Sequence, residues 1–428
     1  MASVPSVLPP GDPAPADGSL PAPALAGLGS RPFGVYVHVP FCATRCGYCD
    51  FNTYTPGELG SAASPASWLA GLRRELELAA RVLAGSPGGG GSGGGGSGGG
   101  GPGAPPVAGT VFVGGGTPSL LGAPVLAAVL GAVRATFGLA AGAEVTTEAN
   151  PESTSPEFFD GIRAAGYTRV SLGMQSVAPH VLAVLDRTHT PGRAAAAAGQ
   201  ALAAGFEHVN LDLIYGAPGE RSQDLLATLD AVLAARADHV SAYSLIVEDG
   251  TALAARVRRG ELPMPDDDVL AQRYELVDGV LSAAGLRWYE VSNWAASPQA
   301  RCRHNLGYWH GDDWWGFGPG AHSHVGGVRW WNVKHPAAYA ARLAGGASPA
   351  AARETLSPAQ RGTERIMLEL RLSDGLPASA LDPAGLAAAR TAAADGLLEP
   401  AALAGGHAVL TARGRLLADA VVRALVPA

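Results

Sequence analysis

The stretch Val35–Asn52, with the sequence VYVHVPFCATRCGYCDFN, decides both the fold and the chemistry that we expect of this chain. It contains Cys42, Cys46 and Cys49, which are three of the four cysteines in the sequence. A short apolar strand, Val35–Val39, leads directly into the loop that carries them, so the three sulfur atoms can converge. Thiolates are the usual ligands of iron–sulfur clusters, and a cubane cluster contains four irons. Three cysteines therefore leave one iron open to a small molecule.

Other uses of the three cysteines stay open at this point. A structural zinc site takes four ligands, and the fourth cysteine, Cys302, lies far away in the sequence. A disulfide framework is typical of small secreted domains, whereas this chain has 428 residues. The type and number of ligands favour an iron–sulfur cluster over zinc.

Composition narrows the class of protein. The formal net charge is −7 and the pI is about 5.9, which argues against a nucleic-acid partner because phosphate binding needs a basic face. We find no run of about 20 apolar residues and no basic residue before Arg31, so neither a membrane span nor a secretory signal is predicted. A reduced, cytoplasmic location follows. Residues 1–31 are rich in Pro, Ala and Gly and are expected to be a disordered leader.

Short β-rich runs alternate with Ala/Leu-rich helical segments from residue 32 to residue 250. This alternation predicts β–α units and a parallel sheet, and six units would curl into a partial (β/α)6 TIM-like barrel of the α/β class. Reactive groups in such a sheet lie at the carboxyl ends of the strands. A Gly/Ser-rich run at 86–106 is expected to be a flexible insertion. The six strands are expected at Val35–Val39, Thr110–Val113, Glu144–Glu148, Arg169–Met174, His208–Ile214 and His239–Leu245.

Two further regions follow the barrel. Residues 251–352 are expected to extend it, and residues 353–428 to form a small winged-helix-like α/β domain. In that domain we expect helices at Glu364–Leu372, Leu381–Ala394 and Leu416–Leu425, a strand starting at Gly396, and a cap at Thr411. The acidic balance argues against DNA binding, so this domain is expected to cover the barrel mouth.

The cysteine spacing, with Tyr48 before the last cysteine, resembles the motif of radical S-adenosylmethionine (SAM) proteins, in which SAM chelates the open iron. Five motifs, YVHVPFC, GGGTPS, EANP, GMQS and DLIYG, together resemble the oxygen-independent coproporphyrinogen III oxidase family. The resemblance implies a [4Fe-4S] cluster on the three cysteines. By motif position it also implies that SAM is contacted by Tyr36, Tyr48, Gly116, Thr117, Glu148, Gln175, Arg187, Asp212 and Ser244.

One departure from the oxidase pattern separates two functions. The oxidases carry a further cysteine two residues after the third one, where this chain has Phe51. The sequence Cys-Asp-Phe-Asn instead resembles the heme-chaperone subfamily, as does the heme-binding signature His304–Trp309. Imidazole is a common axial ligand of heme iron, and aromatic faces suit a porphyrin. The resemblance thus implies heme contacts from His304, Asn305, Tyr308 and Trp309, with His304 on the iron.

The function that the resemblance implies is a heme chaperone. Such a protein binds heme and a SAM-ligated cluster and passes the heme to acceptor hemoproteins. The alternative is a radical enzyme that decarboxylates coproporphyrinogen III to protoporphyrinogen IX. Cys302 stays ambiguous between a heme ligand, an attachment site and a small buried residue. We also expect an electron donor for the cluster and a monomer or dimer, and we leave a transient membrane contact open.

Overall fold

A computed structural model describes residues 10–59, 63–85 and 104–426. Most of the expected glycine-rich insertion, 86–103, lies outside these residues. Within them, thirteen strands form one continuous sheet, and a second pair of short strands belongs to the C-terminal module.

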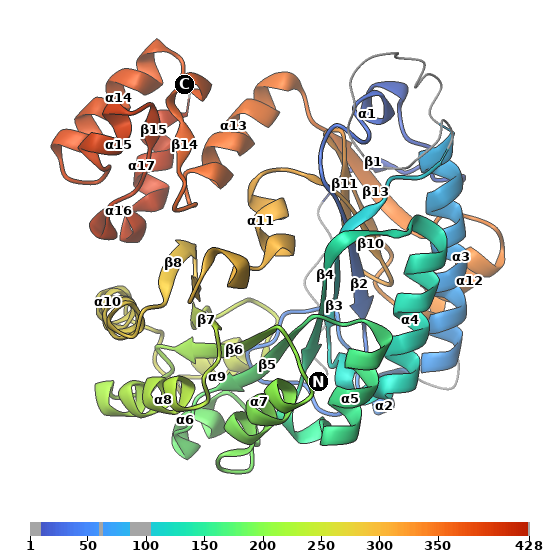
Figure 1. Cartoon of the computed structure of the whole chain (residues 1–428), viewed down its shortest axis with the longest axis horizontal. Helices are drawn as coiled ribbons and strands as arrows, with labels where there is room; N and C mark the ends of the chain where they lie inside the picture. The colour runs from blue at the N-terminus through green and yellow to red at the C-terminus, as the bar shows by residue number, and fades with distance from the viewer. Residues whose placement is uncertain (1–9, 60–62, 86–103, 427–428) are drawn as a thin grey trace.

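Six parallel strands form the curved centre of this sheet and follow each other in chain order. The predicted partial barrel is therefore confirmed (Figure 1). The residue register places Tyr36 beside Phe112, which fixes which side chains share a level inside the barrel. The strands are β2 (Phe33–Val39), β3 (Ala108–Gly115), β4 (Leu139–Ala149), β5 (Arg169–Gln175), β6 (His208–Tyr215) and β7 (His239–Ser244).

Helices cover the outer face of these strands, where the apolar side chains point. Val35, Val37 and Val39 of β2 are fully buried on that side. The helix against them begins with a capping box at Ser64, and its Trp68 donates from Nε1 to the carbonyl of His38 at 3.1 Å. The helices are α3 (Pro65–Ala84), α4 (Gly122–Phe137), α5 (Pro156–Ala165), α7 (Arg193–Ala203) and α8 (Ser222–Ala234).

Further strands extend the sheet beyond both ends of the barrel. On one side β10 (Asp313–Phe317) runs parallel to β2 and is followed by β11 (His322–Val325), β12 (Val328–Asn332), β13 (Ala350–Thr355) and β1 (Asp12–Pro13). On the other side β7 pairs with β9 (Asn293–Ala295) and then β8 (Arg287–Glu290). Because β13 ends at Thr355, residues 353–355 belong to the main sheet and not to the C-terminal module.

The described part of the N-terminal leader is ordered, so the prediction of disorder is wrong for residues 10–31. Asp12 and Pro13 pair with β13, and the short helix α1 (Ala22–Ala26) buries Ala24 and Leu25 against the main core. A free edge strand next to a few apolar side chains is enough to order this segment, despite its Pro-rich composition.

The C-terminal module has a hydrophobic core of its own. It contains α13 (Pro358–Glu369), α14 (Pro383–Ala394), α15 (Pro400–Ala404), α16 (Ala412–Leu416) and α17 (Ala418–Leu425), with β14 (Leu376–Pro377) paired to β15 (His407–Ala408). The predicted cap is confirmed, because the Thr411 side chain accepts from the Gly414 amide. The strand expected at Gly396 is reduced to a single bridge between Leu398 and Leu410.

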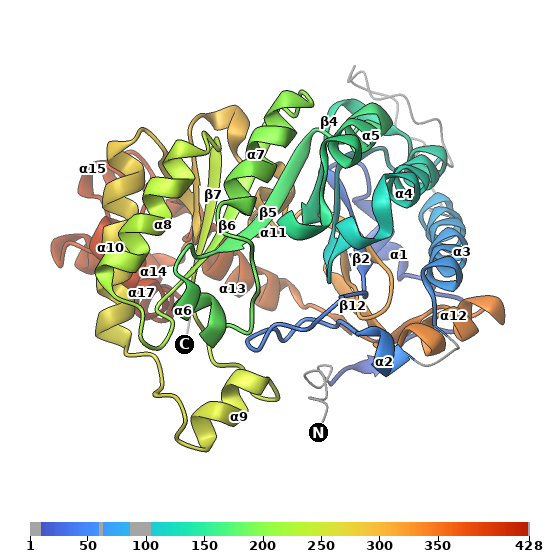
Figure 2. The same cartoon turned by 90° about the horizontal axis from the view of Figure 1, so that it is seen from below.

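The position of this module differs from the prediction. Ser373 N donates to the carbonyl of Tyr289, and Arg415 pairs with Asp278 of α10 (Asp267–Ala283). The module thus packs beside β8 and α10, at the opposite end of the barrel from the cysteine loop (Figures 1 and 2). It does not cover the mouth of the barrel.

One segment, Pro118–Phe137, is long and apolar enough to cross a membrane by length and composition, which the composition analysis did not predict. It comprises the single turn η1 (Pro118–Leu121) and helix α4. Residues such as Leu126, Leu130 and Phe137 on its buried face form part of the barrel core, although only 28% of its most apolar 18-residue window is buried.

Candidate functional site

The cysteine loop leaves the carboxyl end of β2 and is held by backbone hydrogen bonds. Cys42 N donates to the carbonyl of Tyr54 at 3.0 Å, and Gly47 N donates to that of Leu185 at 3.1 Å. The carbonyl of Gly47 accepts from Leu253 N at 2.8 Å. None of these bonds uses a sulfur atom, so the loop keeps its shape while the thiols stay available to ligands.

The glycine-rich turn after β3 supports the same loop. Gly116 N donates to the carbonyl of Val39 at 2.7 Å, and Thr117 N donates to that of Phe41 at 2.8 Å. A Cβ on Gly116 would lie only 2.5 Å from the Phe41 oxygen. The absence of a side chain at this position is therefore explained by close packing on the cysteine loop.

Two side chains donate hydrogen bonds to the cysteine sulfurs. Thr117 Oγ1 lies 3.6 Å from Cys42 Sγ, and Arg187 Nη1 lies 3.3 Å from Cys46 Sγ. Burial raises the pKa of the Cys42 thiol, and it raises the pKa of Cys49 to about 12. Binding of a cation would offset this cost, since thiolates are the ligand form.

The arrangement fits a cluster better than a single ion. Among residues 10–59, 63–85 and 104–426, no three His, Cys, Asp or Glu side chains lie close enough together to hold one metal ion. A cubane cluster does not require the three sulfur atoms to meet at one ion, because each cysteine binds a different iron. The described geometry therefore offers no zinc site at Cys42, Cys46 and Cys49, while three half-exposed thiols on one pinned loop fit the cluster.

Three of the residues expected to contact SAM line a cavity of about 200 Å³ inside the barrel, between the cysteine loop and the amino ends of the strands. They are Tyr36, Glu148 and Asp212. Burial, followed by the nearby Asp212 carboxyl, raises the pKa of Glu148 to about 8, and burial raises the pKa of Asp212. This part of the barrel therefore disfavours a second negative charge and favours a cationic or hydroxyl-bearing ligand.

The other residues expected to contact SAM lie around the cysteine loop. Arg187 contacts Cys46, and Tyr48 lies close enough to Cys46 and Arg187 to interact with both electrostatically. Gln175 ends β5 with a φ of 65°, the left-handed conformation that carries the chain away from the sheet. Ser244 ends β7. The nine residues thus form two groups, one lining the cavity and one around the cysteine loop, and the Gly115 amide, which donates to Glu148, links the two.

The residues of the expected heme signature lie elsewhere, on the short helix α11 (Arg303–Trp309). This helix contacts the start of β3, so it closes the amino end of the barrel, opposite to the cysteine loop. Cys302, His304, Asn305 and Tyr308 line the cavity from this side. The two predicted sites therefore face each other across one cavity.

His304 is engaged on both ring nitrogens. Its Nδ1 lies 2.8 Å from Thr110 Oγ1, and its Nε2 lies 2.8 Å from Tyr308 Oη. Its ring stacks on Phe112, and the side chain is only 3% exposed. Burial lowers the pKa of His304 to about 4, so the ring is neutral at pH 7. In this conformation the imidazole has no nitrogen directed to a ligand outside the barrel.

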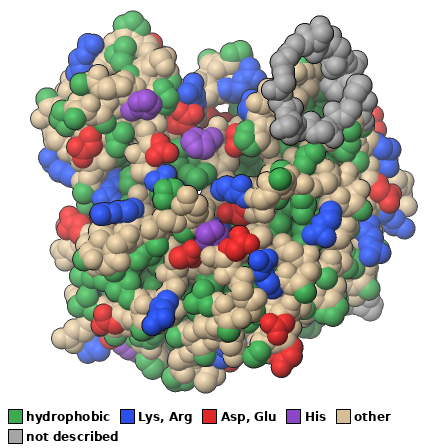
Figure 3. All heavy atoms as spheres, in the orientation of Figure 1, with side chains coloured by type: hydrophobic (Ala, Val, Ile, Leu, Met, Phe, Trp, Pro, Cys, Tyr) green, Lys and Arg blue, Asp and Glu red, His purple; other side chains and the backbone are tan. Residues whose placement is uncertain are grey.

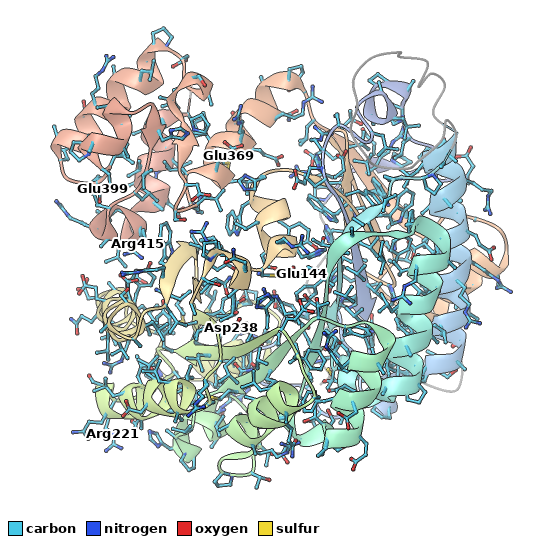
Figure 4. All side chains as sticks on the ribbon, viewed as in Figure 1. Glu144, Arg221, Asp238, Glu369, Glu399 and Arg415 are labelled. Carbon is cyan, nitrogen blue, oxygen red and sulfur yellow. The ribbon has the colours of Figure 1, made fainter. Side chains whose placement is uncertain are left out.

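A buried carboxylate holds α11 in place. Glu144 on β4 accepts from the amides of Arg303 and His304, at 3.1 Å and 3.0 Å, and from Cys302 Sγ at 3.5 Å. Arg169 pairs with Glu144 at 3.2 Å, and both side chains are almost completely buried. Figure 4 shows Glu144 between α11 and the barrel strands. Cys302 is thereby placed as a small buried side chain beside this ion pair.

Comparison with known proteins identifies the family. Residues 104–232 match the model of the radical SAM superfamily. The chain is 61% identical to the heme chaperone HemW of Mycobacterium tuberculosis over 404 residues, which cover 94% of this chain and 97% of that protein. This chain belongs to the HemW family. Escherichia coli HemW is 34% identical over 69% of this chain and 70% of its own length.

The fold of this HemW-family chain is shared with an enzyme. The E. coli coproporphyrinogen III oxidase HemN, a radical SAM enzyme, superposes with a TM-score of 0.76 at 22% identity. The match covers 95% of this chain and 92% of the oxidase. At that identity the likeness establishes the fold alone, and both the partial barrel and the C-terminal region lie within it.

Membership of the HemW family and the radical SAM superfamily gives the site its cofactors. A [4Fe-4S] cluster and SAM are implied, and the residues present fit them: three thiols on one pinned loop, and an acidic cavity beside it. Once bound, the reduced cluster can supply an electron to the SAM sulfonium. This chain's own part is to hold both groups, with Arg187 and Thr117 against the sulfurs.

Sequence reasoning missed several polar side chains that line the cavity of this HemW-family protein. The inner faces of the strands carry polar residues at every second position, as Arg169 and Ser171 do on β5, and as Asn210 does on β6 beside the predicted Asp212. A period of two in polar residues along otherwise apolar strands could have indicated them. Glu144 had no comparable signal, since its partners lie about 160 residues further along the chain.

Proposed function

We propose that this chain is a heme chaperone, which binds heme and passes it to acceptor hemoproteins. Family membership supports this assignment, since the relative at 61% identity is named for that function. The observation that carries it within the structure is the closure of the amino end of the barrel by α11. A helix bearing the heme signature forms the floor of the cavity in which a radical SAM enzyme would hold its substrate.

The size of the cavity disfavours the oxidase reaction. Pockets for drug-sized ligands span roughly 300–1,000 Å³, and a tetrapyrrole exceeds most drugs in size. The cavity here measures about 200 Å³, and it borders residues expected to contact SAM. Phe51, where the oxidases have a cysteine, is 58% exposed and offers no ligand. Decarboxylation of coproporphyrinogen III is therefore not proposed.

We place heme on the outer side of α11. Figure 3 shows a hollow between the C-terminal module, at the upper left, and the barrel. Trp309 of α11 is half-buried and Arg303 of the same helix is exposed, whereas the Tyr308 hydroxyl bonds to His304 on the cavity side. An arginine of this kind can pair with a heme propionate, while aromatic faces contact the porphyrin.

Iron ligation by His304 then needs a movement of α11. The ring must leave Thr110 and Tyr308, which means breaking two hydrogen bonds and its stacking on Phe112. We propose that this release accompanies heme binding, and that an external electron donor reduces the cluster. We propose a cytoplasmic location for the chain, where it would meet its acceptor hemoproteins.

The first experiment is a heme titration of the reconstituted protein, followed by the Soret band. We expect binding of about one heme per chain, and at least a tenfold weaker affinity in His304→Ala. His310→Ala is the matched control, because His310 is exposed at the end of the same helix. Unchanged heme affinity in His304→Ala with a loss in His310→Ala would move the iron ligand to His310.

A parallel assay separates the two functions. The reconstituted protein receives SAM, a reductant and coproporphyrinogen III, and the tetrapyrrole is followed by mass. We expect no decarboxylation. Loss of two carboxyl groups over many turnovers would make the chain an oxidase and would contradict the chaperone assignment.

A further inference from the structure

Arg187 has more contacts than its expected role with SAM requires. Its Nη1 donates to Cys46 Sγ at 3.3 Å, its Nη2 to the carbonyl of Gly173 at 3.1 Å, and its Nε to His189 Nε2 at 2.8 Å. A guanidinium has five N–H groups, so these contacts leave two for a ligand such as a carboxylate. The side chain is thus fixed in one orientation before any cofactor arrives.

The approach of this guanidinium to β5 depends on the residue type at 173. A Cβ on Gly173 would lie 2.8 Å from Arg187 Nη2, closer than side chains tolerate. The absence of a side chain at Gly173 therefore lets Arg187 approach the strand, and the carbonyl of Gly173 accepts from its Nη2. Its Nη1 then reaches Cys46 in the cysteine loop.

His189 accepts the hydrogen bond from Nε of Arg187 and so fixes the third of its donors. Its side chain is 6% exposed, and its Nε2 accepts from Arg187, so Nδ1 carries the proton. That Nδ1 faces Glu152 Oε1 at 3.9 Å. The Glu152 carboxylate in turn accepts from the Thr190 amide at 2.7 Å and from its hydroxyl at 3.2 Å, which anchors the segment that carries His189.

We propose that Arg187 tunes the reduction potential of the cluster through its hydrogen bond to Cys46 Sγ, and that His189 is the residue that positions Arg187 for this bond. This inference rests on the radical SAM cluster and not on heme, so it stands apart from the proposed chaperone function.

Physical chemistry gives the direction of the effect. Hydrogen bonds to the sulfurs of an iron–sulfur cluster, and positive charge nearby, stabilise the reduced state because that state carries one more negative charge. A guanidinium bond to a thiolate is charge-assisted and therefore stronger than a neutral one. If the Arg187 guanidinium loses its orientation toward Cys46, the midpoint potential of the cluster falls, which makes the cluster harder to reduce.

The test is a redox titration of the reconstituted full chain without SAM, followed by the electron paramagnetic resonance of the reduced cluster. His189→Leu removes the acceptor at similar volume, and we expect a lower midpoint potential. His189→Gln keeps an oxygen within reach of Arg187 Nε, and we expect it to restore the wild-type value. His180→Leu is the matched control, because His180 contacts Asp224 and is 46% exposed.

Two results would overturn the proposal. One is a wild-type potential in His189→Leu at full iron content, and the other is an equal fall in His189→Leu and His189→Gln. If the His189→Leu variant holds no cluster, the same redox titration is made on His189→Asn, whose shorter amide cannot reach Arg187. A wild-type potential in that variant contradicts the proposal, and a lowered one that Gln reverses supports it.

Discussion

A single carboxylate, Glu144, connects the barrel to the helix that closes it. It accepts from two backbone amides at the start of α11 and from a thiol, and it pairs with Arg169. Arg169 also donates to the carbonyl of Ala300 at 2.8 Å, so the ion pair binds the segment before the helix as well. The position of His304 thus depends on two residues outside its own motif.

Replacing Glu144 by Ala should destabilise the fold strongly, because it leaves the Arg169 charge buried without the carboxylate that neutralises it. Such losses cost about 3–5 kcal/mol. Chemical denaturation measures the change, and Glu207→Ala serves as a control, since Glu207 pairs with Arg163 on the surface and that loss costs less than about 1 kcal/mol. A cost as small for Glu144→Ala would show that Glu144 does not hold the helix.

The low pKa of His304 predicts a pH dependence. The folded chain resists protonation of His304 down to about pH 4, whereas the released ring titrates near its usual 6.5. The free energy holding α11 is therefore constant above pH 6.5 and falls below it, by about 1.4 kcal/mol per pH unit. Hydrogen exchange of the α11 amides, corrected for intrinsic rates, should show this loss of protection. In His304→Gln that slope should disappear, and its persistence would point to another group.

At the scale of elements, the N-terminal segment shows how short pieces complete a large sheet. Asp12 and Pro13 extend the edge formed by β13, and Leu25 packs on the main core. The Leu25→Ala variant should lose about 2–4 kcal/mol of stability through the cavity that it leaves. Thermal unfolding tests this, with Ala26→Ser on the exposed side of α1 as control. Equal melting temperatures would restore the expectation of a loosely attached leader.

Elements with a local sequence pattern could be predicted from the sequence, whereas those that depend on distant partners could not. The six barrel strands were predictable because each is an apolar run between helix-forming segments, and the cysteine loop because its spacing is local. The two residues of β1 carry no period, so their pairing with β13 depends on an edge that forms about 340 residues later. The placement of His304 inside the barrel likewise depends on Thr110 and Glu144, which no local pattern relates to it.

At the scale of the whole molecule, two hydrophobic cores meet at a polar contact. Arg415 of the C-terminal module pairs with Asp278 at 2.7 Å and lies 4.6 Å above the ring of Trp288. Figure 4 shows Arg415 at the edge of the module that faces β8 and α10. The module has its own core, so its attachment can weaken without unfolding the barrel.

We expect Arg415→Ala to weaken this attachment by about 2–4 kcal/mol, since it removes the hydrogen bonds to Asp278 and Tyr274 together with the cation–π contacts to Tyr274 and Trp288. Limited proteolysis should then cut between the barrel and the module more readily. Arg423→Ala, at an exposed position on α17, is the control. If both variants resist the protease like the wild type, other contacts hold the module.

The backbone pinning of the cysteine loop has a consequence for biogenesis. Many small metal-binding domains fold only when the metal arrives, because their ligand loops have no other support. Here Cys42 and Gly47 are tied to Tyr54, Leu185 and Leu253 through peptide groups alone. We therefore expect the chain to fold before the cluster is inserted, and to stay folded and able to bind a new cluster after oxidative loss of the first.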